Sequence, residues 1–162
     1  MKNVVVTGMG IISCIGSGLN EVLLSLKNGK SGIKSNPTYK EMGFRSHVSG
    51  SIDINLSELI DRKVLRFMSE ASGFAYLAAQ EALLNAGLDL SSIDTSRVGI
   101  IAGSGGASSA AQIEASDIAR AKGPKRIGPY AVTKTMGSTV SAILGTTLKL
   151  KGVNYSISSA CS

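Results

Sequence analysis

Apolar residues recur at helical spacing in several segments of the chain. In residues 69–86 they fall three or four positions apart, at Ala71, Phe74, Ala75, Ala78, Ala82 and Ala86. This spacing predicts a helix with one apolar face, and Gly87 is the glycine expected just past its end. So many alanines indicate that this face packs closely against a neighbouring element. Shorter helices are predicted at 20–27 and within 108–121 and 136–148.

Short β-branched or apolar runs predict strands. Residues 2–6 are expected to form a buried strand that ends at Gly8, and 97–102 a strand that opens into the glycine-rich loop 103–106. A last strand is expected at 153–158. Strands that alternate with helices favour an α/β domain with a mainly parallel sheet.

Composition supports one globular unit. With 43% hydrophobic and 17% charged residues, the chain is predicted to be globular rather than disordered. Residues 29–57 lack a regular pattern, and we expect loops there with one short strand near 45–48. No polar linker divides the chain, so residues 1–162 are predicted to form one domain or part of one.

The formal net charge is +6, which favours an acidic partner: nucleic acid, anionic lipid or an acidic protein. Aromatic residues are sparse and are not interleaved with the basic ones, which weakens the nucleic-acid interpretation. We find neither a secretory signal nor an apolar run of about 20 residues. The two cysteines, Cys14 and Cys161, form no metal-ligand or disulfide pattern. We therefore expect a soluble, cytoplasmic and reduced protein.

Two glycine-rich segments invite a nucleotide-binding interpretation. Gly8-Met9-Gly10 has Ser13 where the dinucleotide fingerprint needs a third glycine or alanine, so a turn after a strand is favoured. The loop 103–106 lacks the Gly-Lys-Ser/Thr ending of a P-loop. From its sequence it is equally a loop that admits a ligand close to the backbone and a plain tight turn.

Basic residues gather in two places. Arg62, Lys63 and Arg66 form the first cluster, and Arg62 and Arg66 share a face if the segment is helical. The second cluster is Lys122, Lys125 and Arg126, on either side of Pro124. Each cluster, taken alone, is more typical of a solvated face than of a binding site.

Cys161 is the strongest candidate for chemistry. It follows the strand predicted at 153–158 and stands among small residues. A strand–turn–helix elbow would expose the thiol, and a helix N-terminus would favour the reactive thiolate. Buried free cysteines, however, are common and inert. Spacing alone leaves the two interpretations open.

Five stretches, taken together in chain order, carry a resemblance: residues 5–10, 59–63, 101–106, 128–130 and 152–161, the last reading Gly-Val-Asn-Tyr-Ser-Ile-Ser-Ser-Ala-Cys. They resemble motifs of the β-ketoacyl-acyl carrier protein synthases, type I in particular, and the last resembles the nucleophile motif. The resemblance covers the whole chain. It implies the layered, thiolase-like fold, with this chain as its N-terminal half, and usually a homodimer.

The resemblance also implies a reaction: decarboxylating Claisen condensation in fatty-acid elongation. Cys161 would accept the acyl group from acyl carrier protein, and Gly106 and Met136 would line the acyl pocket. Malonyl-acyl carrier protein would lose carbon dioxide and attack the acyl thioester. Arg62, Lys63, Arg66, Lys125 and Arg126 would meet the acidic carrier protein. Neither a metal nor a redox cofactor is implied, and neither nucleic-acid binding nor membrane insertion is expected.

The chain departs from the family pattern in one respect. The family's synthases continue past the nucleophile into an activating helix and a second half with two histidines and a lysine, and His47 matches neither histidine. We therefore expect this chain to belong to a longer enzyme and to be inactive by itself. The alternative is a non-catalytic module that binds acyl carrier protein.

Overall fold

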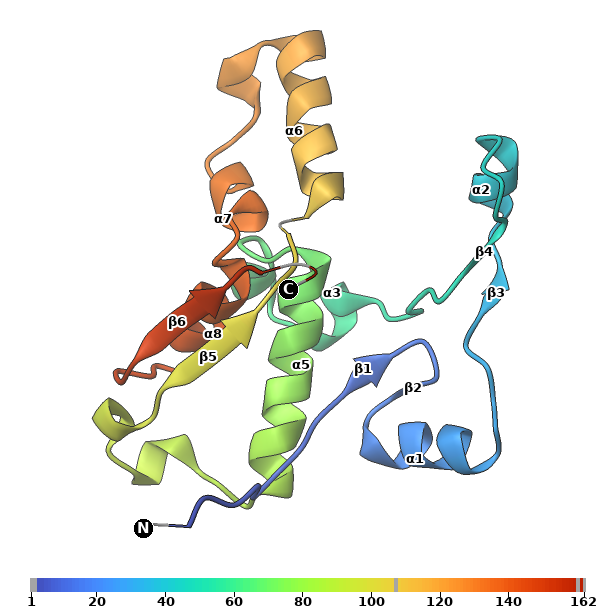
Figure 1. The fold of residues 1–162 in the computed structure, drawn as a ribbon. Helices are drawn as coiled ribbons and strands as arrows, with labels where there is room; N and C mark the ends of the chain where they lie inside the picture. Colours follow the sequence, from blue (N-terminus) through green and yellow to red (C-terminus); the bar gives the residue numbers. More distant parts are fainter. Residues whose placement is uncertain (1–2, 107, 160, 162) are drawn as a thin grey trace. The chain divides into compact units, whose positions relative to one another are not determined.

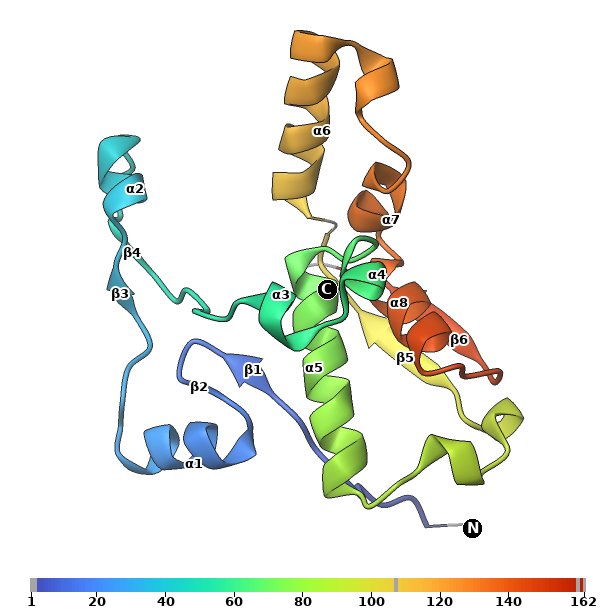
Figure 2. The same ribbon diagram turned by 180° about the vertical axis from the view of Figure 1, so that it is seen from behind.

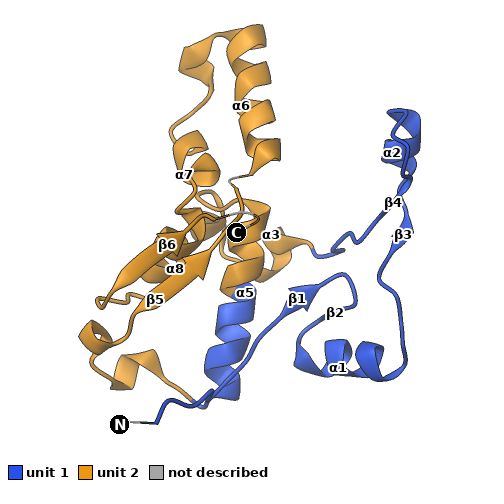
Figure 3. Cartoon of the chain, in the orientation of Figure 1, with its two compact units in different colours: residues 1–54, 77–87 blue, residues 55–76, 88–162 orange. Residues whose placement is uncertain are grey.

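The computed structural model describes residues 3–106, 108–159 and 161. The chain has an α/β composition (Figure 1) and divides into two compact units, coloured separately in Figure 3. Unit 1 comprises Met1–Ile54 and Leu77–Gly87, and unit 2 comprises Asn55–Tyr76 and Leu88–Ser162. The long helix α5 (Glu70–Asn85) contributes to both. The assignment of residues 1–162 to one domain part stays a prediction.

Among its described residues, unit 1 contains two small antiparallel pairs and two short helices besides its share of α5. Its elements are β1 (Ile12–Ser13), β2 (Gly16–Ser17), α1 (Leu19–Lys27), β3 (Lys34–Ser35), α2 (Pro37–Glu41) and β4 (Val48–Ser49). Strand β1 pairs with β2, and β3 pairs with β4. Helix α2 is absent from the sequence-based expectation, although Asn36 accepts a hydrogen bond from the Tyr39 N–H and Pro37 follows it, a common helix start.

Glycine and alanine bring the N-terminal segment against α5. A Cβ atom on Gly10 would lie 1.9 Å from the Ala78 carbonyl oxygen, and one on Gly8 would lie 2.2 Å from that of Ala82. Such distances are far inside van der Waals contact, so only glycine fits at either position. The predicted close packing of the alanine face is thus confirmed, and Gly8 and Gly10 serve this packing.

The carboxylate of Glu81, on α5, accepts hydrogen bonds from two further backbone N–H groups. Its Oε2 accepts a hydrogen bond from the Ile11 N–H at 2.9 Å, and its Oε1 accepts one from the Leu19 N–H at 2.7 Å. Because Leu19 is the first residue of α1, this carboxylate also satisfies one of the free N–H groups at that helix start.

The Glu81→Gln variant should lower the free energy of unfolding by about 1–3 kcal/mol, because the new NH₂ group cannot accept one of these two bonds. Urea unfolding of the complete polypeptide measures this, with Glu114→Gln on the surface of α6 as the control. Equal stability of the two variants would contradict the bridging role.

In the part of unit 2 that the structure describes, the strands form one parallel pair. Its helices and strands are α3 (Leu56–Leu59), α4 (Arg62–Leu65), the start of α5, β5 (Ile100–Gly103), α6 (Ser109–Lys122), α7 (Ala131–Thr135), α8 (Thr139–Thr147) and β6 (Asn154–Ile157), with 3₁₀ turns at Leu90–Ser92, Thr95–Arg97 and Pro124–Arg126. Strands β5 and β6 run parallel, with Ile100 opposite Asn154 and Gly103 opposite Ile157. Helix α8 packs on both strands, as Figures 1 and 2 show.

Most predicted elements are confirmed within a few residues: α1, α5, α6, α8, β5, β6 and a strand close to 45–48. Strand β5 starts at Ile100 rather than at 97, because Asp94 accepts a hydrogen bond from the Ser96 N–H and a 3₁₀ turn occupies Thr95–Arg97. A hydrogen bond from the Ser96 hydroxyl, together with the one from the Ser96 N–H, lowers the pKa of Asp94.

The predicted buried strand at 2–6 is wrong for the residues that the structure describes. Residues 3–6 form no strand, and Val4, Val5 and Val6 are 97%, 72% and 81% exposed. A strand needs a neighbour to pair its backbone groups, and no described strand pairs with this segment.

In the part of the chain that the structure describes, no helix has the length and apolarity needed to cross a bilayer.

Candidate functional site

The parallel pair β5–β6 defines one edge at which several candidate residues emerge. Because the strands are parallel, their carboxyl ends lie together: Gly103 pairs with Ile157, and the Ser104 N–H donates to the Ile157 carbonyl at 3.1 Å. The glycine-rich loop leaves this edge after β5, and the segment that carries Cys161 leaves it after β6 (Figure 1). In α/β sheets, ligands bind at this end of the strands.

Cys161 is a free and exposed cysteine four residues beyond β6. Of the predicted elbow, the described residues include the strand and the thiol, while Ala160 and Ser162 lie outside them. The exposure is that of the described residues alone, so the role of Cys161 as nucleophile stays a prediction. Cys14, in contrast, is half-buried, and a Cβ on Gly32 would lie 2.6 Å from its Sγ.

Gly106 and Met136, the predicted acyl-pocket residues, line one cavity of about 220 Å³. Its wall comes from the start of α5, the loop after β5, the first residues of α6 and the α7–α8 connection. The Thr139 hydroxyl donates to the Met136 carbonyl at 2.6 Å, and the Ser104 hydroxyl donates to the Gly106 carbonyl at 2.6 Å. The volume is below the roughly 300–1,000 Å³ of complete small-molecule pockets, and the acyl-pocket role of these residues stays a prediction.

Met136 also borders a second cavity, of about 360 Å³. Apolar side chains of α4 and α8, among them Val64 and Ile143, line this groove, and Lys63 stands in its wall. The structure therefore places a residue of the first basic cluster and a predicted acyl-pocket residue beside the same groove, which sequence reasoning did not anticipate.

Arg66 is held by two aromatic rings. Its guanidinium lies 5.4 Å from the Phe67 ring centroid and 5.6 Å from that of Tyr130, and Nη1 donates to the Tyr130 hydroxyl at 3.3 Å. The two rings meet edge to face at 4.8 Å. Arg62 and Lys63 begin α4 after Asp61, whose carboxylate accepts a hydrogen bond from the Lys63 N–H. All three basic side chains are exposed, as a binding surface requires.

Lys125 and Arg126 lie in the 3₁₀ turn after α6 and are also exposed. Figure 2 shows this turn at the outer end of α6, whereas α4 lies near the inner end of α7. The structure thus brings Arg66 to Tyr130 but leaves the two clusters as separate patches of unit 2.

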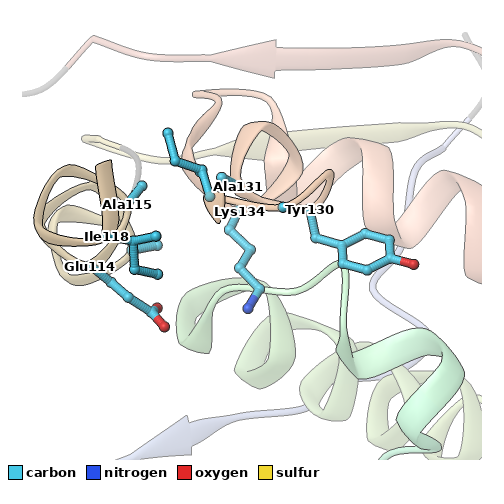
Figure 4. Close-up of a pocket in the computed structure, with 9 residues that line it drawn as sticks. Glu114, Ala115, Ile118, Tyr130, Ala131 and Lys134 are labelled. Atoms are coloured by element: carbon cyan, nitrogen blue, oxygen red, sulfur yellow. The ribbon is translucent and has the colours of Figure 1, made fainter. Parts of the chain in front are cut away.

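A small cavity of about 120 Å³ separates α6 from α7 (Figure 4). Ala115, Ile118 and Ala131 line it, with Glu114 and Lys134 at its polar side, while the Tyr130 ring points away from α6. Among the described residues, no group of three or more His, Cys, Asp or Glu side chains could hold a metal ion.

Comparison with known proteins relates the whole chain to one family. The family described as "Beta-ketoacyl synthase, N-terminal domain" matches residues 1–162. The chain is 54% identical over 162 residues to 3-oxoacyl-(acyl-carrier-protein) synthase 1 of Haemophilus influenzae, and 51% identical over 163 residues to the protein of that name from Escherichia coli. Each alignment covers 99% of this chain and 40% of the relative.

A solved structure confirms the predicted thiolase-like fold class. It is a ketosynthase in complex with the acyl carrier protein of a type II polyketide synthase, and it aligns with a TM-score of 0.74 at 23% identity, over all of this chain and 42% of that one. At this identity the likeness concerns the fold alone. The chain spans about 40% of the length of the relatives that it matches.

Proposed function

From the premise that this chain belongs to the β-ketoacyl synthase family, whose N-terminal domain it matches over residues 1–162, we propose that it forms the N-terminal part of a condensing enzyme of fatty-acid elongation. Identity above 50% to two synthases of type 1 supports this class. The single observation that carries the proposal is the exposed thiol of Cys161 beyond the carboxyl end of β6.

Cys161 acts as the acyl acceptor in this proposal. Its thiolate attacks the acyl carbonyl of acyl-carrier protein, a new C–S bond forms, and the carrier's own thiol leaves. Malonyl-carrier protein then loses carbon dioxide, and the resulting carbanion attacks the acyl thioester. Cys161 departs as the leaving group, and 3-ketoacyl-carrier protein is released. The Cys161 N–H supplies half of an oxyanion hole for the tetrahedral intermediate.

Gly106 and Met136 line the acyl pocket in this scheme. They share one cavity, and the loop that carries Gly106 leaves the same sheet edge as the segment that carries Cys161. A Cβ on Gly106 would meet nothing within 4 Å among the described residues, so the space above it is open to substrate. The remaining wall comes from parts of the enzyme beyond this chain or from a second subunit.

The partner is acyl carrier protein, bound through Arg62, Lys63, Arg66, Lys125 and Arg126. All five side chains are exposed, and the net charge of +6 suits an acidic protein. The structurally similar ketosynthase is itself in complex with an acyl-carrier protein.

We further propose that the enzyme is cytoplasmic and homodimeric. Apolar side chains are exposed on one face of the β5–β6 pair, with Ile101 at 73% and Tyr155 at 63%. Because exposed apolar surface is unfavourable in water, we expect further protein to cover this face.

The Arg62→Glu, Lys63→Glu and Arg66→Glu triple variant should weaken acyl-carrier protein binding by at least about 10-fold at low salt, because attraction becomes repulsion. The difference from wild type should shrink as salt rises. Surface plasmon resonance with the complete polypeptide measures both effects. The control is the Lys30→Glu, Lys34→Glu and Lys151→Glu variant, which changes net charge by the same amount. Equal binding by the two variants would refute this docking surface.

An elongation assay tests the function itself. The complete polypeptide that carries this chain, given acyl- and malonyl-carrier protein, should release carbon dioxide and 3-ketoacyl-carrier protein in equal amounts. Formation of neither product would contradict the proposed reaction. Carbon dioxide without the ketoacyl product would contradict condensation and restrict the enzyme to decarboxylation.

A further inference from the structure

Strand β6, which leads to Cys161, meets α8 through polar side chains. Side chains alternate along a strand, so Asn154 and Ser156 share one face while Tyr155 and Ile157 share the other. Asn154 Nδ2 donates to the Ser141 carbonyl at 3.0 Å, and the Ser156 and Ser141 hydroxyl oxygens lie 2.5 Å apart. One residue of α8 therefore receives two contacts from β6.

The α8 side is shaped to receive these contacts. Ser141 is 4% exposed, and its hydroxyl also donates to the Ser138 carbonyl at 3.2 Å, which leaves the Ser156 hydroxyl to donate in the contact between the two serines. One turn later, a Cβ on Gly145 would lie 2.3 Å from Asn154 Nδ2. Any other residue at position 145 would thus collide with the amide that reaches the Ser141 carbonyl. Sequence patterns predicted α8 and β6 but gave no sign of this polar contact.

We propose that Asn154, Ser156 and Ser141 form a polar clamp that fixes β6 on α8 and thereby positions Cys161 for acyl transfer. This inference rests on the proposed function. Apolar packing is non-directional, whereas hydrogen bonds restrict both distance and angle. The clamp is anchored five residues before the nucleophile, and the Ser104 N–H holds the Ile157 carbonyl at the strand end. The three clamp residues are positioning residues, because they act through the strand rather than on substrate.

Positioning has a kinetic signature that a loss of folding lacks. A misplacement of about 1 Å at a reacting centre can lower the rate about 100-fold. Ser156→Ala should therefore lower kcat for acyl transfer to Cys161 by about 10-fold or more and leave KM for acyl-carrier protein within twofold. Ser156→Thr, which keeps the hydroxyl and suits a strand, should stay within twofold of the wild-type kcat.

The matched control is Thr147→Val, which also removes a hydroxyl from α8. The Thr147 hydroxyl donates to the Ile143 carbonyl within α8 and makes no bond to β6. This variant should keep the wild-type kcat. If Ser156→Ala folds poorly, the Ser141→Ala and Ser156→Ala double variant removes both hydroxyls of the contact, so that no buried hydroxyl is left facing a missing partner. That variant should fold and still show the lowered kcat.

Hydrogen exchange separates failure of the clamp from failure of the proposed function. In the complete polypeptide, amides of the peptide that follows β6 and contains Cys161 should exchange about 10-fold faster in Ser156→Ala and unchanged in Thr147→Val, whether or not the protein condenses acyl groups. Wild-type kcat or unchanged exchange in Ser156→Ala would overturn the clamp. Absence of acyl transfer in the wild type, with faster exchange in the variant, would overturn the function and leave the clamp supported.

Discussion

Cys161→Ala should abolish acyl transfer from acyl-carrier protein and lower turnover by more than about 10⁴-fold, the scale seen when a covalent nucleophile is removed. The methyl group cannot form a thioester, so the acyl group stays on the carrier. A stopped-flow or quenched assay of free carrier thiol after mixing with the complete polypeptide measures this step.

Cys14→Ala is the matched control for that experiment. Its Sγ lies beneath Gly32 and is half-buried, so this thiol has a packing role and the variant should keep the wild-type rate. A Cys161→Ala protein with normal acyl transfer, or loss of transfer in Cys14→Ala alone, would assign the nucleophile elsewhere.

Gly10→Ala should lower the free energy of unfolding by about 3 kcal/mol. The added Cβ would lie 1.9 Å from the Ala78 carbonyl oxygen, a backbone atom within α5 that cannot move aside without breaking helical hydrogen bonds. Overpacking of this kind typically costs about 1–3 kcal/mol, and backbone collisions fall at the upper end.

Guanidinium chloride unfolding of the complete polypeptide measures this loss. Gly105→Ala is the control, because a Cβ there would meet nothing within 4 Å and the backbone is not left-handed. If Gly10→Ala were as stable as Gly105→Ala, the close approach of the N-terminal segment to α5 would be contradicted.

Sequence patterns predicted the elements whose residue spacing and end signals lie within the element itself. The alanine spacing of α5 and the glycine at its end place that helix within one residue at each end. The strand predicted at 2–6 failed because pairing depends on distant residues, and Val4 to Val6 find no paired strand among the described residues. The pair Asn36-Pro37 would have predicted α2, because this pair is a common helix start.

For the candidate site, the sequence named residues but not their geometry. The resemblance named Cys161, Gly106 and Met136, and the structure places Gly106 and Met136 on one cavity. No sequence pattern pairs Arg66 with Tyr130, 64 positions apart, or Glu81 with Ile11, 70 positions apart. Such contacts arise from tertiary packing, which local propensity does not encode.

Locating the acyl group on the protein tests the central claim most directly. The complete polypeptide is incubated with acyl-carrier protein without a malonyl donor, digested, and mapped by mass spectrometry. The account predicts one acyl group per chain, as a hydroxylamine-sensitive thioester on the peptide that contains Cys161. An unmodified Cys161 peptide, or an acyl group on any other residue, would contradict it.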